Sequence, residues 1–424
     1  MAKQTFDDIA CTVCGCVCDD LRVSVADGKL TAIEPHCSLA EAWFLKQNVD
    51  PAPPAAELDG KPADYAAAIT EAAAILRGAK APLIYGLARS STPGQRAAVR
   101  LADELGAIID TNASTCHGPS IVALQAVGES TSTLGEVRNR ADLVIYWGSN
   151  PAVSHPRHME RYAVDPKGTF TPGGRADRTL VVVDSRESET AKSADIFLKV
   201  EKGRDFDVLW VLRALVQGKE LDVAEVGGIE IGKLKNLAER MKSCKTGVVF
   251  FGRGLTLGSV GHADVEALLR LTMELNAFTR FYARRMRIYG DVAGADSVLT
   301  WQTGYPFSVN LARGYPRYSP AEYSADACLT RGEVDACLIV GGEGVKTLSE
   351  RARERLAGVP VIVLDYASAE RLMTPRVRFT TAVYGIHRAA TAYRMDEVPI
   401  PLRGFLPSPL ASDDEVLEAI RAAL

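Results

Sequence analysis

Short runs of apolar residues recur along the chain, and most of them end in small or polar residues. Four lie in the first half, in APLIYGLA, GAIIDTNAS, ADLVIYWGSNP and RTLVVVDSRES, and three more follow from residue 246 on, in TGVVFFGRG, ACLIVGGEG and VPVIVLDYAS. Segments of helical length separate these runs. Buried strands that alternate with helices are typical of parallel sheets. The pattern therefore predicts an α/β fold with two parallel-sheet halves.

The two ends of the chain depart from this pattern. LRVSVADGKLTAIEPH is a pair of alternating strands joined by Asp27-Gly28, a strong hairpin signal. VDPAPPAAELDGKP, which follows it, is typical of a linker, and the final SDDEVLEAIRAAL is an amphipathic helix that Ser412 can cap. We therefore predict a small β-rich N-terminal unit with its linker, two α/β domains and a C-terminal segment packed on them: residues 1–60, 61–242, 243–370 and 371–424.

Composition and charge restrict the classes of protein. The chain has 424 residues, 47% of them hydrophobic and 24% charged, which indicates a globular protein of more than one domain. A net charge of −4 gives no support to nucleic-acid binding, which uses basic surfaces. The apolar runs are too short to span a bilayer, and MAKQTFDDIA lacks the apolar core of a secretory signal. We expect a cytoplasmic protein without a membrane segment.

Five of the nine cysteines are concentrated near the N-terminus, at Cys11, Cys14, Cys16, Cys18 and Cys37. Disulfides are rare in the cytosol, so these thiols need another explanation. Thiolates this close in sequence repel one another unless a metal neutralises them. An iron–sulfur cluster would use four of them, with Cys16 as an extra thiol that no ligand set requires. The alternatives are a zinc ion or an empty site.

The loops after the apolar runs hold further candidates. In open parallel sheets, ligands bind beyond the carboxyl ends of the strands. Gly148 allows a tight turn after one run, and Asn150 then presents both a hydrogen-bond donor and an acceptor. Asp184 ends another run, while Gly341 and Gly342 allow the backbone to approach a ligand closely. Each signal alone also occurs in turns with a purely structural role.

Together, these loops resemble the molybdopterin and tungstopterin oxidoreductases. That family combines an N-terminal iron–sulfur motif with G-x-N-P-x-x-x-H-P and D-x-R-x-x-E-T-A-x-x-A-D, and both patterns occur here in the same order. The resemblance implies a fold of molybdopterin-oxidoreductase type with a bis-pterin cofactor between α/β domains. It assigns the ancestral pterin loops to Gly148, Asn150, Pro151, His155, Asp184, Arg186, Thr190, Asp195, Gly341 and Gly342.

A closer resemblance is to the B-subunit family of formylmethanofuran dehydrogenases. It rests on CTVCGCVCDD, DTNASTCHGPS, WQTGYPFSVNLARGYPRY and TAYRMDEVPIPLRG, and it covers most of the chain. It implies three catalytic residues: the Mo or W ligand Cys116, the acid–base residue His117 and the formate-binding Arg287. It also implies a [4Fe–4S] cluster held by Cys11, Cys14, Cys18 and Cys37. The alternative for Cys116 and His117 is a buried thiol and a hydrogen-bonded histidine in an inherited loop.

Bacterial relatives of this B-subunit belong to a formyltransferase/hydrolase complex of methylotrophic one-carbon metabolism. That complex moves a formyl group from tetrahydromethanopterin to a methanofuran-like carrier and releases formate. Its amidohydrolase and formyltransferase subunits carry the chemistry. We therefore predict a catalytically silent, structural B-subunit in such a hetero-oligomer. Its cofactor stays open between none, a [4Fe–4S] cluster without pterin, and a [4Fe–4S] cluster with a bis-pterin Mo or W centre. The alternative is an active dehydrogenase subunit with a bis-pterin Mo or W centre and a [4Fe–4S] cluster.

Three side chains after Arg287 motivate the silent hypothesis. Ile288, Tyr289 and Asp291 stand where a cofactor and formate would approach. The two bulky side chains would fill space there, and the carboxylate would repel an anion. Only 20 residues follow TAYRMDEVPIPLRG, too few for the β-barrel that ends larger members of the superfamily, so we expect no C-terminal barrel.

Overall fold

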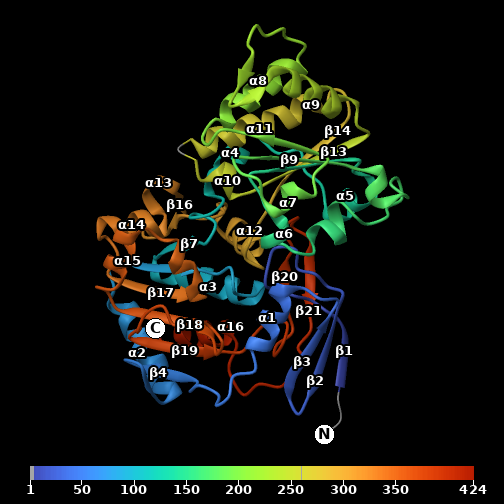
Figure 1. Cartoon of the computed structure of the whole chain (residues 1–424). Helices are drawn as coiled ribbons and strands as arrows, with labels where there is room; N and C mark the ends of the chain where they lie inside the picture. The colour runs from blue at the N-terminus through green and yellow to red at the C-terminus, as the bar shows by residue number, and fades with distance from the viewer. Residues whose placement is uncertain (1–3, 259) are drawn as a thin grey trace. The chain divides into compact units, whose positions relative to one another are not determined.

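Two compact units make up the structure, a computed structural model that describes residues 4–258 and 260–424 (Figure 1). Unit 1 combines the chain up to Thr115 with Tyr289–Leu424, and unit 2 is Cys116–Ile288. Unit 1 is therefore built from two separate segments of the sequence, and unit 2 is inserted between them.

Unit 1 begins with an antiparallel three-stranded sheet in the order β1-β2-β3: β1 (Gln4–Ile9), β2 (Leu21–Ala26) and β3 (Lys29–Glu34). Asp27 and Gly28 connect β2 to β3 with φ values of 53° and 74°, the positive values that a tight hairpin turn requires. Residues 10–20, between β1 and β2, form what we call the thiol loop. Helix α1 (Ser38–Lys46) starts directly after Cys37.

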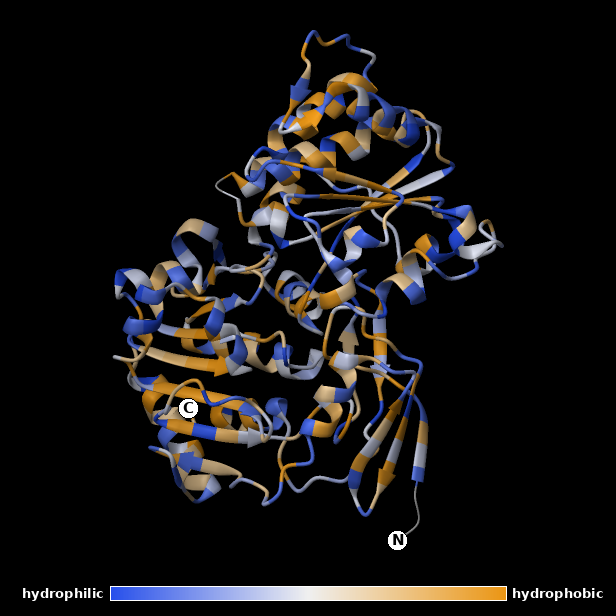
Figure 2. Ribbon diagram, in the orientation of Figure 1, coloured by the Kyte–Doolittle hydropathy of each residue, from blue (hydrophilic) through white to orange (hydrophobic). Residues whose placement is uncertain are grey.

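The larger sheet of unit 1 has nine strands in the order β16-β15-β7-β6-β17-β18-β19-β4-β5. Its central strands, β7 to β19 in this order, are parallel. Alternate side chains enter two cores, one beneath α2, α3, α12 and α16 and the other beneath α14 and α15. Figure 2 shows these central strands as strongly hydrophobic, as burial on both faces demands.

The strands of this sheet are β4 (Ala56–Leu58), β5 (Lys61–Pro62), β6 (Pro82–Gly86), β7 (Ile108–Thr111), β15 (Val309–Asn310), β16 (Arg317–Tyr318), β17 (Ala336–Val340), β18 (Val361–Tyr366) and β19 (Val377–Thr381). The other elements of unit 1 are α2 (Tyr65–Gly78), α3 (Thr92–Leu105), α12 (Val292–Thr303), α13 (Pro320–Tyr323), α14 (Ala325–Arg331), η3 (Gly342–Thr347), α15 (Glu350–Leu356), the hairpin β20 (Ala390–Tyr393) and β21 (Pro399–Leu402), and α16 (Asp413–Ala422).

Unit 2 contains a parallel five-stranded sheet in the order β10-β9-β8-β13-β14. Helices α4, α8, α9 and α11 bury their apolar sides in one core with this sheet. Its strands are β8 (Leu143–Trp147), β9 (Thr179–Asp184), β10 (Ile196–Lys199), β13 (Thr246–Phe251) and β14 (Arg280–Arg285). The other elements are α4 (Gly118–Val127), α5 (Leu134–Arg140), α6 (Pro151–Ser154), η1 (Met159–Ala163), η2 (Gly174–Asp177), α7 (Glu189–Lys192), α8 (Asp205–Val216), β11 (Glu225–Val226), β12 (Ile229–Glu230), α9 (Ile231–Ser243), α10 (Arg253–Thr256) and α11 (Gly261–Leu275).

The predicted α/β fold with parallel sheets is confirmed, and all seven apolar runs form strands. The strands are distributed between the sheets differently from the predicted domains 61–242 and 243–370. Strands β6 and β7 pair with β17 in unit 1, whereas β13 and β14 join β8 in unit 2. The prediction assumed that neighbouring strands in the sequence share a sheet, and the chain instead leaves its first sheet after β7 and returns to it after β14.

Two other segments differ from expectation. Part of the predicted linker forms β4 and β5, which add a hairpin to the edge of the nine-stranded sheet. Asp59 and Gly60 permit this turn because both have positive φ. From the C-terminal segment, β19 also joins the sheet, and α16 starts with the expected Ser412 cap. Within the described ranges, no helix combines the length and the apolar character needed to cross a membrane.

Candidate functional site

The strand order of unit 2 creates a crevice at the carboxyl ends of β8 and β13. From β8 the chain proceeds outward to β9 and β10, and from β13 it proceeds in the other direction to β14. Ligands of open α/β sheets bind at such a reversal of strand order. The loops that meet there begin with Gly148 after β8, Asp184 at the end of β9 and Arg253 after β13.

Two of these loops touch each other through glycines. A Cβ atom on Gly148 would lie 2.8 Å from the Leu255 nitrogen, and one on Gly254 would lie 2.7 Å from the Gly148 oxygen. Gly148 also has a φ of 55°, which side chains with a Cβ rarely adopt. A hydrogen bond of 3.0 Å from Gly254 N–H to the Gly148 carbonyl closes the contact. The loops can approach this closely only because both positions are glycine.

A pocket of about 530 Å³ opens at this crevice, lined by Gly148, Asp184, Lys202, Gly203, Asp205, Arg253, Gly254 and Asp264 among others. Arg253 and Lys202 supply positive charge, and Nε of Arg253 is buried without a hydrogen-bond partner in the described part of the chain. Burial and the nearby Asp205 raise the pKa of Asp264 to about 6. Two cations and close glycine backbone are groups that can contact a phosphate, while the carboxyls of Asp184, Asp205 and Asp264 suit the polar groups of a ligand.

Only part of this pocket was predicted from the sequence. Gly148 and Asp184, two of the predicted cofactor-binding residues, line it, whereas Lys202, Arg253 and Gly254 are not among the predicted residues. The signal was present in FFGRG, a glycine-flanked arginine directly after an apolar run.

Other residues assigned to the pterin loops shape the crevice through hydrogen bonds. Asn150 Oδ1 accepts from the hydroxyl of Thr190 at 2.7 Å, and that hydroxyl oxygen accepts from Ala152 N–H at 3.1 Å. Pro151 occupies the first turn of α6. These contacts connect α6, after β8, with α7, after β9. Asn150, Pro151 and Thr190 thus hold two loops together.

Arg186 and Asp195 lie outside the pocket lining. Arg186 is exposed, and its backbone N–H donates to Asp184 at 3.4 Å. Asp195 accepts from Leu180 N–H at 2.7 Å and forms an ion pair of 2.8 Å with Arg175. The hydrogen bond from Arg175 lowers the pKa of this carboxyl. In this structure Asp195 fixes the start of β10 against β9.

The three catalytic candidates come together within unit 2. Cys116 and His117 directly precede α4, and Arg287 follows β14. His117 Nε2 donates to the Met286 carbonyl at 3.1 Å, next to Arg287, while Thr256 donates to the Cys116 carbonyl at 3.0 Å. Burial, followed by the charge of Arg287, lowers the pKa of His117, so its imidazole is neutral. Residues 170 positions apart in the sequence therefore share one site.

His155 links the loop after β8 to the same site. Its Nε2 donates to the Arg287 carbonyl at 2.7 Å, and its Nδ1 lies 2.8 Å from the Ser154 hydroxyl. A carbonyl can only accept, so the neutral ring carries its proton on Nε2. Burial lowers the pKa of His155 to about 4. In this structure His155, assigned to the pterin loops, contacts and orients the backbone at Arg287.

The stability contributed by His155 should depend on pH. Its pKa falls from 6.5 in the unfolded chain to about 4 in the folded one, so acid protonates the unfolded chain first. We expect the advantage of the wild type over His155→Gln in free energy of unfolding to be complete above pH 6.5 and to shrink by about 3 kcal/mol toward pH 4. Urea unfolding of both proteins at several pH values measures it, and an equal difference at pH 7.5 and 4.5 would contradict it.

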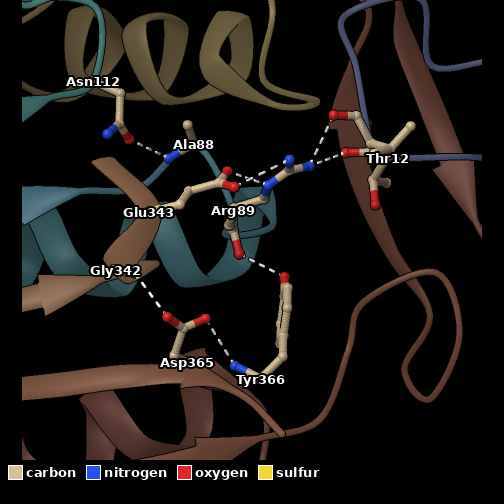
Figure 3. Close-up of polar contacts among 9 residues, drawn as sticks. Thr12, Ala88, Arg89, Asn112, Gly342, Glu343, Asp365 and Tyr366 are labelled. Carbon is tan, nitrogen blue, oxygen red and sulfur yellow. Dashed lines mark hydrogen bonds and ion pairs between the residues drawn. The ribbon is translucent and has the colours of Figure 1, made fainter. Parts of the chain in front are cut away.

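Unit 1 has a corresponding reversal of strand order between β6 and β17. Figure 3 shows the residues that meet there, with Arg89 from the loop after β6, Glu343 from the loop after β17 and Asp365 from β18. Gly342 N–H donates to the Asp365 carboxylate at 2.8 Å, and a Cβ on Gly341 would lie 2.9 Å from that of Arg89. The two glycines predicted to approach a cofactor here make room for neighbouring protein atoms.

The four predicted cluster ligands are also in unit 1, and all are buried. Burial raises the pKa of Cys11 and Cys37, and the charges of neighbouring thiols raise both pKa values further, as expected for thiols that lie near one another. A hydrogen bond from Cys16 lowers the pKa of Cys14. Cys16 also forms a side-chain hydrogen bond with Cys18. The extra thiol is therefore buried between two predicted ligands.

A zinc ion and a four-iron cluster would hold these thiols in different geometries. Sulfur atoms around one zinc ion, each about 2.3 Å from the metal, lie within about 4 Å of one another. Across residues 4–258 and 260–424, no three metal-binding side chains are grouped closely enough for one ion. A four-iron cluster separates its thiolates more widely, because each binds a different iron. Four buried thiols in unit 1 match the number of thiolates that such a cluster uses.

The predicted repulsion by Asp291 is wrong. Its two carboxyl oxygens accept from Gln95 Nε2 at 2.9 Å and from Tyr393 N–H at 2.6 Å, all within unit 1. Burial raises its pKa well above the usual range, which reduces its negative charge. Tyr289 lies with its ring centre 5.6 Å from the Arg89 guanidinium, and like Ile288 it is half-buried. Asp291 is a structural residue at the start of α12.

Comparisons with known proteins identify the family of this chain. No protein-family model matches the chain. The B-subunit of tungsten-containing formylmethanofuran dehydrogenase 2 from Methanocaldococcus jannaschii is 39% identical, over 97% of this chain and 97% of its own length. The B-subunit of the formyltransferase/hydrolase complex Fhc from Methylorubrum extorquens is 27% identical, over 67% of this chain and 74% of its own.

A solved structure shares the fold. The crystal structure of the formyltransferase/hydrolase complex FhcABCD from Methylorubrum extorquens, in complex with methylofuran, matches with a TM-score of 0.72 and 23% identity. The match covers 87% of this chain and 98% of the matched one. With a relative 39% identical over almost its whole length, this chain belongs to the B-subunit family of formylmethanofuran dehydrogenases.

Proposed function

We propose that this chain is the redox-active B-subunit of a formylmethanofuran dehydrogenase. Its redox step would interconvert carbon dioxide and formate, taking up or releasing two electrons and one proton, and formate would exchange with the formyl group of the carrier without electron transfer. The observation that carries the proposal is the assembly of Cys116, His117 and Arg287 in unit 2, held by contacts to Thr256 and Met286. The backbone of Cys116, the imidazole of His117 and the peptide before Arg287 are held together there, which supports a retained reaction site.

The residues fit the groups that this activity requires. Cys116 would bind molybdenum or tungsten, because soft thiolates suit such a metal and a helix N-terminus favours negative charge. The pocket at Gly148, Asp184 and Arg253 would hold the phosphate-bearing part of a pterin. Cys11, Cys14, Cys18 and Cys37 would hold a [4Fe–4S] cluster. When bound, these groups would supply the two-electron chemistry and carry the electrons away.

The protein's own side chains would prepare the substrate. Arg287 would bind the carboxylate of formate as a fork of two hydrogen bonds. Its backbone is fixed by His155, which accounts for the buried, neutral imidazole in that position. His117 would exchange the substrate proton, and its ring is already oriented by the Met286 carbonyl. Burial of all three side chains would keep bulk water from the reacting atoms.

This chain would act in a hetero-oligomer. Its relative, the B-subunit of Fhc, is part of a complex of several subunits. We propose amidohydrolase and formyltransferase subunits as partners, which would handle the formyl carrier while this chain handles the electrons.

A second candidate is the catalytically silent B-subunit of a formyltransferase/hydrolase complex. The shared fold with FhcABCD and the half-buried Ile288 and Tyr289 support it. Under this proposal the fold would be retained because it packs against other subunits.

Metal and pterin analysis of the complex, purified anaerobically, separates the two candidates. The dehydrogenase should contain about four irons per chain from its cluster, together with tungsten or molybdenum and a pterin. Iron, tungsten and molybdenum all absent from a complex that transfers formyl groups would leave the silent candidate.

A further inference from the structure

We propose that Arg89 is the positioning residue of the thiol loop: it crosses the strand-order reversal of unit 1 and fixes the backbone between Cys11 and Cys14. The inference rests on the proposed function in one respect, because a cluster bound by these thiols would require them to be held in position. Arg89 is neither a predicted cluster ligand nor a residue of the pterin loops. Its guanidinium donates to backbone carbonyls of the thiol loop (Figure 3).

The backbone beneath Arg89 is held from several sides. Leu87 N–H donates to the Val340 carbonyl at 2.9 Å, and Ala88 N–H donates to Asn112 Oδ1 at 3.1 Å. The Tyr366 hydroxyl donates to the carbonyl of Arg89 itself at 2.6 Å. Leu87 has a φ of 73°, a conformation that costs roughly 1–3 kcal/mol and persists only when the surroundings impose it. The side chain therefore starts from a fixed base.

The guanidinium binds two partners at once. Its Nε forms an ion pair of 2.5 Å with Glu343, and its Nη1 donates to the carbonyls of Thr12 at 2.7 Å and Val13 at 3.0 Å. The ring of Trp43 lies 5.0 Å from the guanidinium carbon. Glu343 thus orients the guanidinium of Arg89, and the guanidinium reaches two consecutive peptide groups of the thiol loop.

The thiol loop has reason to need an external anchor. Two of its backbone hydrogen bonds are internal, from Cys11 N–H to Cys18 O at 2.8 Å and from Val17 N–H to Cys14 O at 3.1 Å. Val17, a β-branched residue, has a φ of 36°, which indicates strain. Buried thiolates would also repel one another and push the loop open. A cation fixed to the carbonyls between Cys11 and Cys14 opposes both effects.

The first test uses the metal-free chain, so it does not depend on a cluster. Cysteine alkylation by iodoacetamide, followed site by site with mass spectrometry, reports how often the loop opens. In Arg89→Met we expect Cys14 and Cys18 to react at least about tenfold faster than in the wild type, which corresponds to roughly 1.4 kcal/mol of lost anchoring. Cys337, buried in β17, serves as the internal reference.

Two further variants sharpen this result. Arg100 lies in α3, the helix that follows Arg89, and forms an ion pair with Glu418. Arg100→Met should leave the alkylation rates of Cys14 and Cys18 unchanged. Arg89→Lys keeps the charge but cannot reach Glu343 and two carbonyls together, so its rates should rise at least about threefold. Unchanged rates in folded Arg89→Met would overturn the proposal. Should that variant fail to fold, unchanged rates in Arg89→Lys would overturn it equally.

A second readout applies to the iron-loaded chain. Removing the cation should make reduction of the cluster harder, so the midpoint potential of Arg89→Met should shift to more negative values, with Arg89→Lys between it and the wild type. An identical potential in all three proteins contradicts the charge contribution of Arg89. If the wild type binds no iron, the proposed function fails, and the alkylation rates still decide the role of Arg89.

Discussion

Replacing Cys116 with serine should abolish formylmethanofuran-dependent reduction of a viologen dye by the purified complex. The expected loss exceeds about 100-fold, because changes to residues that merely contact a metal ligand already cost about 10–100-fold. Tungsten or molybdenum content should fall with activity, since a serine hydroxyl is a harder and weaker ligand than a thiolate. Iron content should stay at the wild-type level, because the proposed cluster ligands belong to unit 1.

Cys244→Ser is the matched control for this experiment. Cys244 is a half-buried thiol of unit 2 at the end of α9, and its sulfur donates to the Met241 carbonyl. Its substitution should change neither metal content nor turnover. A Cys116→Ser complex with full activity would remove the dehydrogenase proposal and favour the silent candidate. Thermal unfolding of both variants shows whether either change acts by disturbing the fold.

The local structure of this chain is readable from its sequence. Asp27-Gly28 predicts a hairpin because its two residues adopt positive φ readily, and Ser412 predicts a helix start because its hydroxyl can accept from the first turn. The apolar runs predict strands for a similar reason, since burial on both faces demands continuous hydrophobicity. The assignment of strands to sheets is not local. Nothing in β7 itself indicates that the next strand of its sheet lies beyond Tyr289.

The candidate site likewise has a part that the local sequence predicts and a part that depends on distant segments. Gly148 and Asp184 could be predicted because each stands at the end of an apolar run. Asp291 was misjudged because its partners Gln95 and Tyr393 come from distant parts of the chain, and a carboxylate at that point in the sequence looks free. Arg89 could not be predicted from the sequence either. It carries no motif, and its importance follows only from the three segments that it joins.

Under the proposed dehydrogenase function, Gly148→Ala should distort the pocket of unit 2 and release the cofactor that it would hold. The new Cβ would lie 2.8 Å from the Leu255 nitrogen, and backbone atoms cannot move aside as a flexible side chain can. The φ of 55° adds strain, so we expect about 2 kcal/mol less stability and a drop of at least about tenfold in bound pterin. Acid release and fluorescence of the pterin measure the second effect.

A glycine elsewhere in unit 2 provides the control that isolates the contact between the two loops. Gly232, in the first turn of α9, would place a Cβ in open space, and Gly232→Ala should retain the pterin and unfold at the wild-type temperature or slightly above it. If Gly148→Ala instead keeps its full pterin content, the crevice between β8 and β13 does not hold the cofactor. If it loses the pterin while Gly232→Ala does not, the loss follows from the approach of two backbones that only glycine permits.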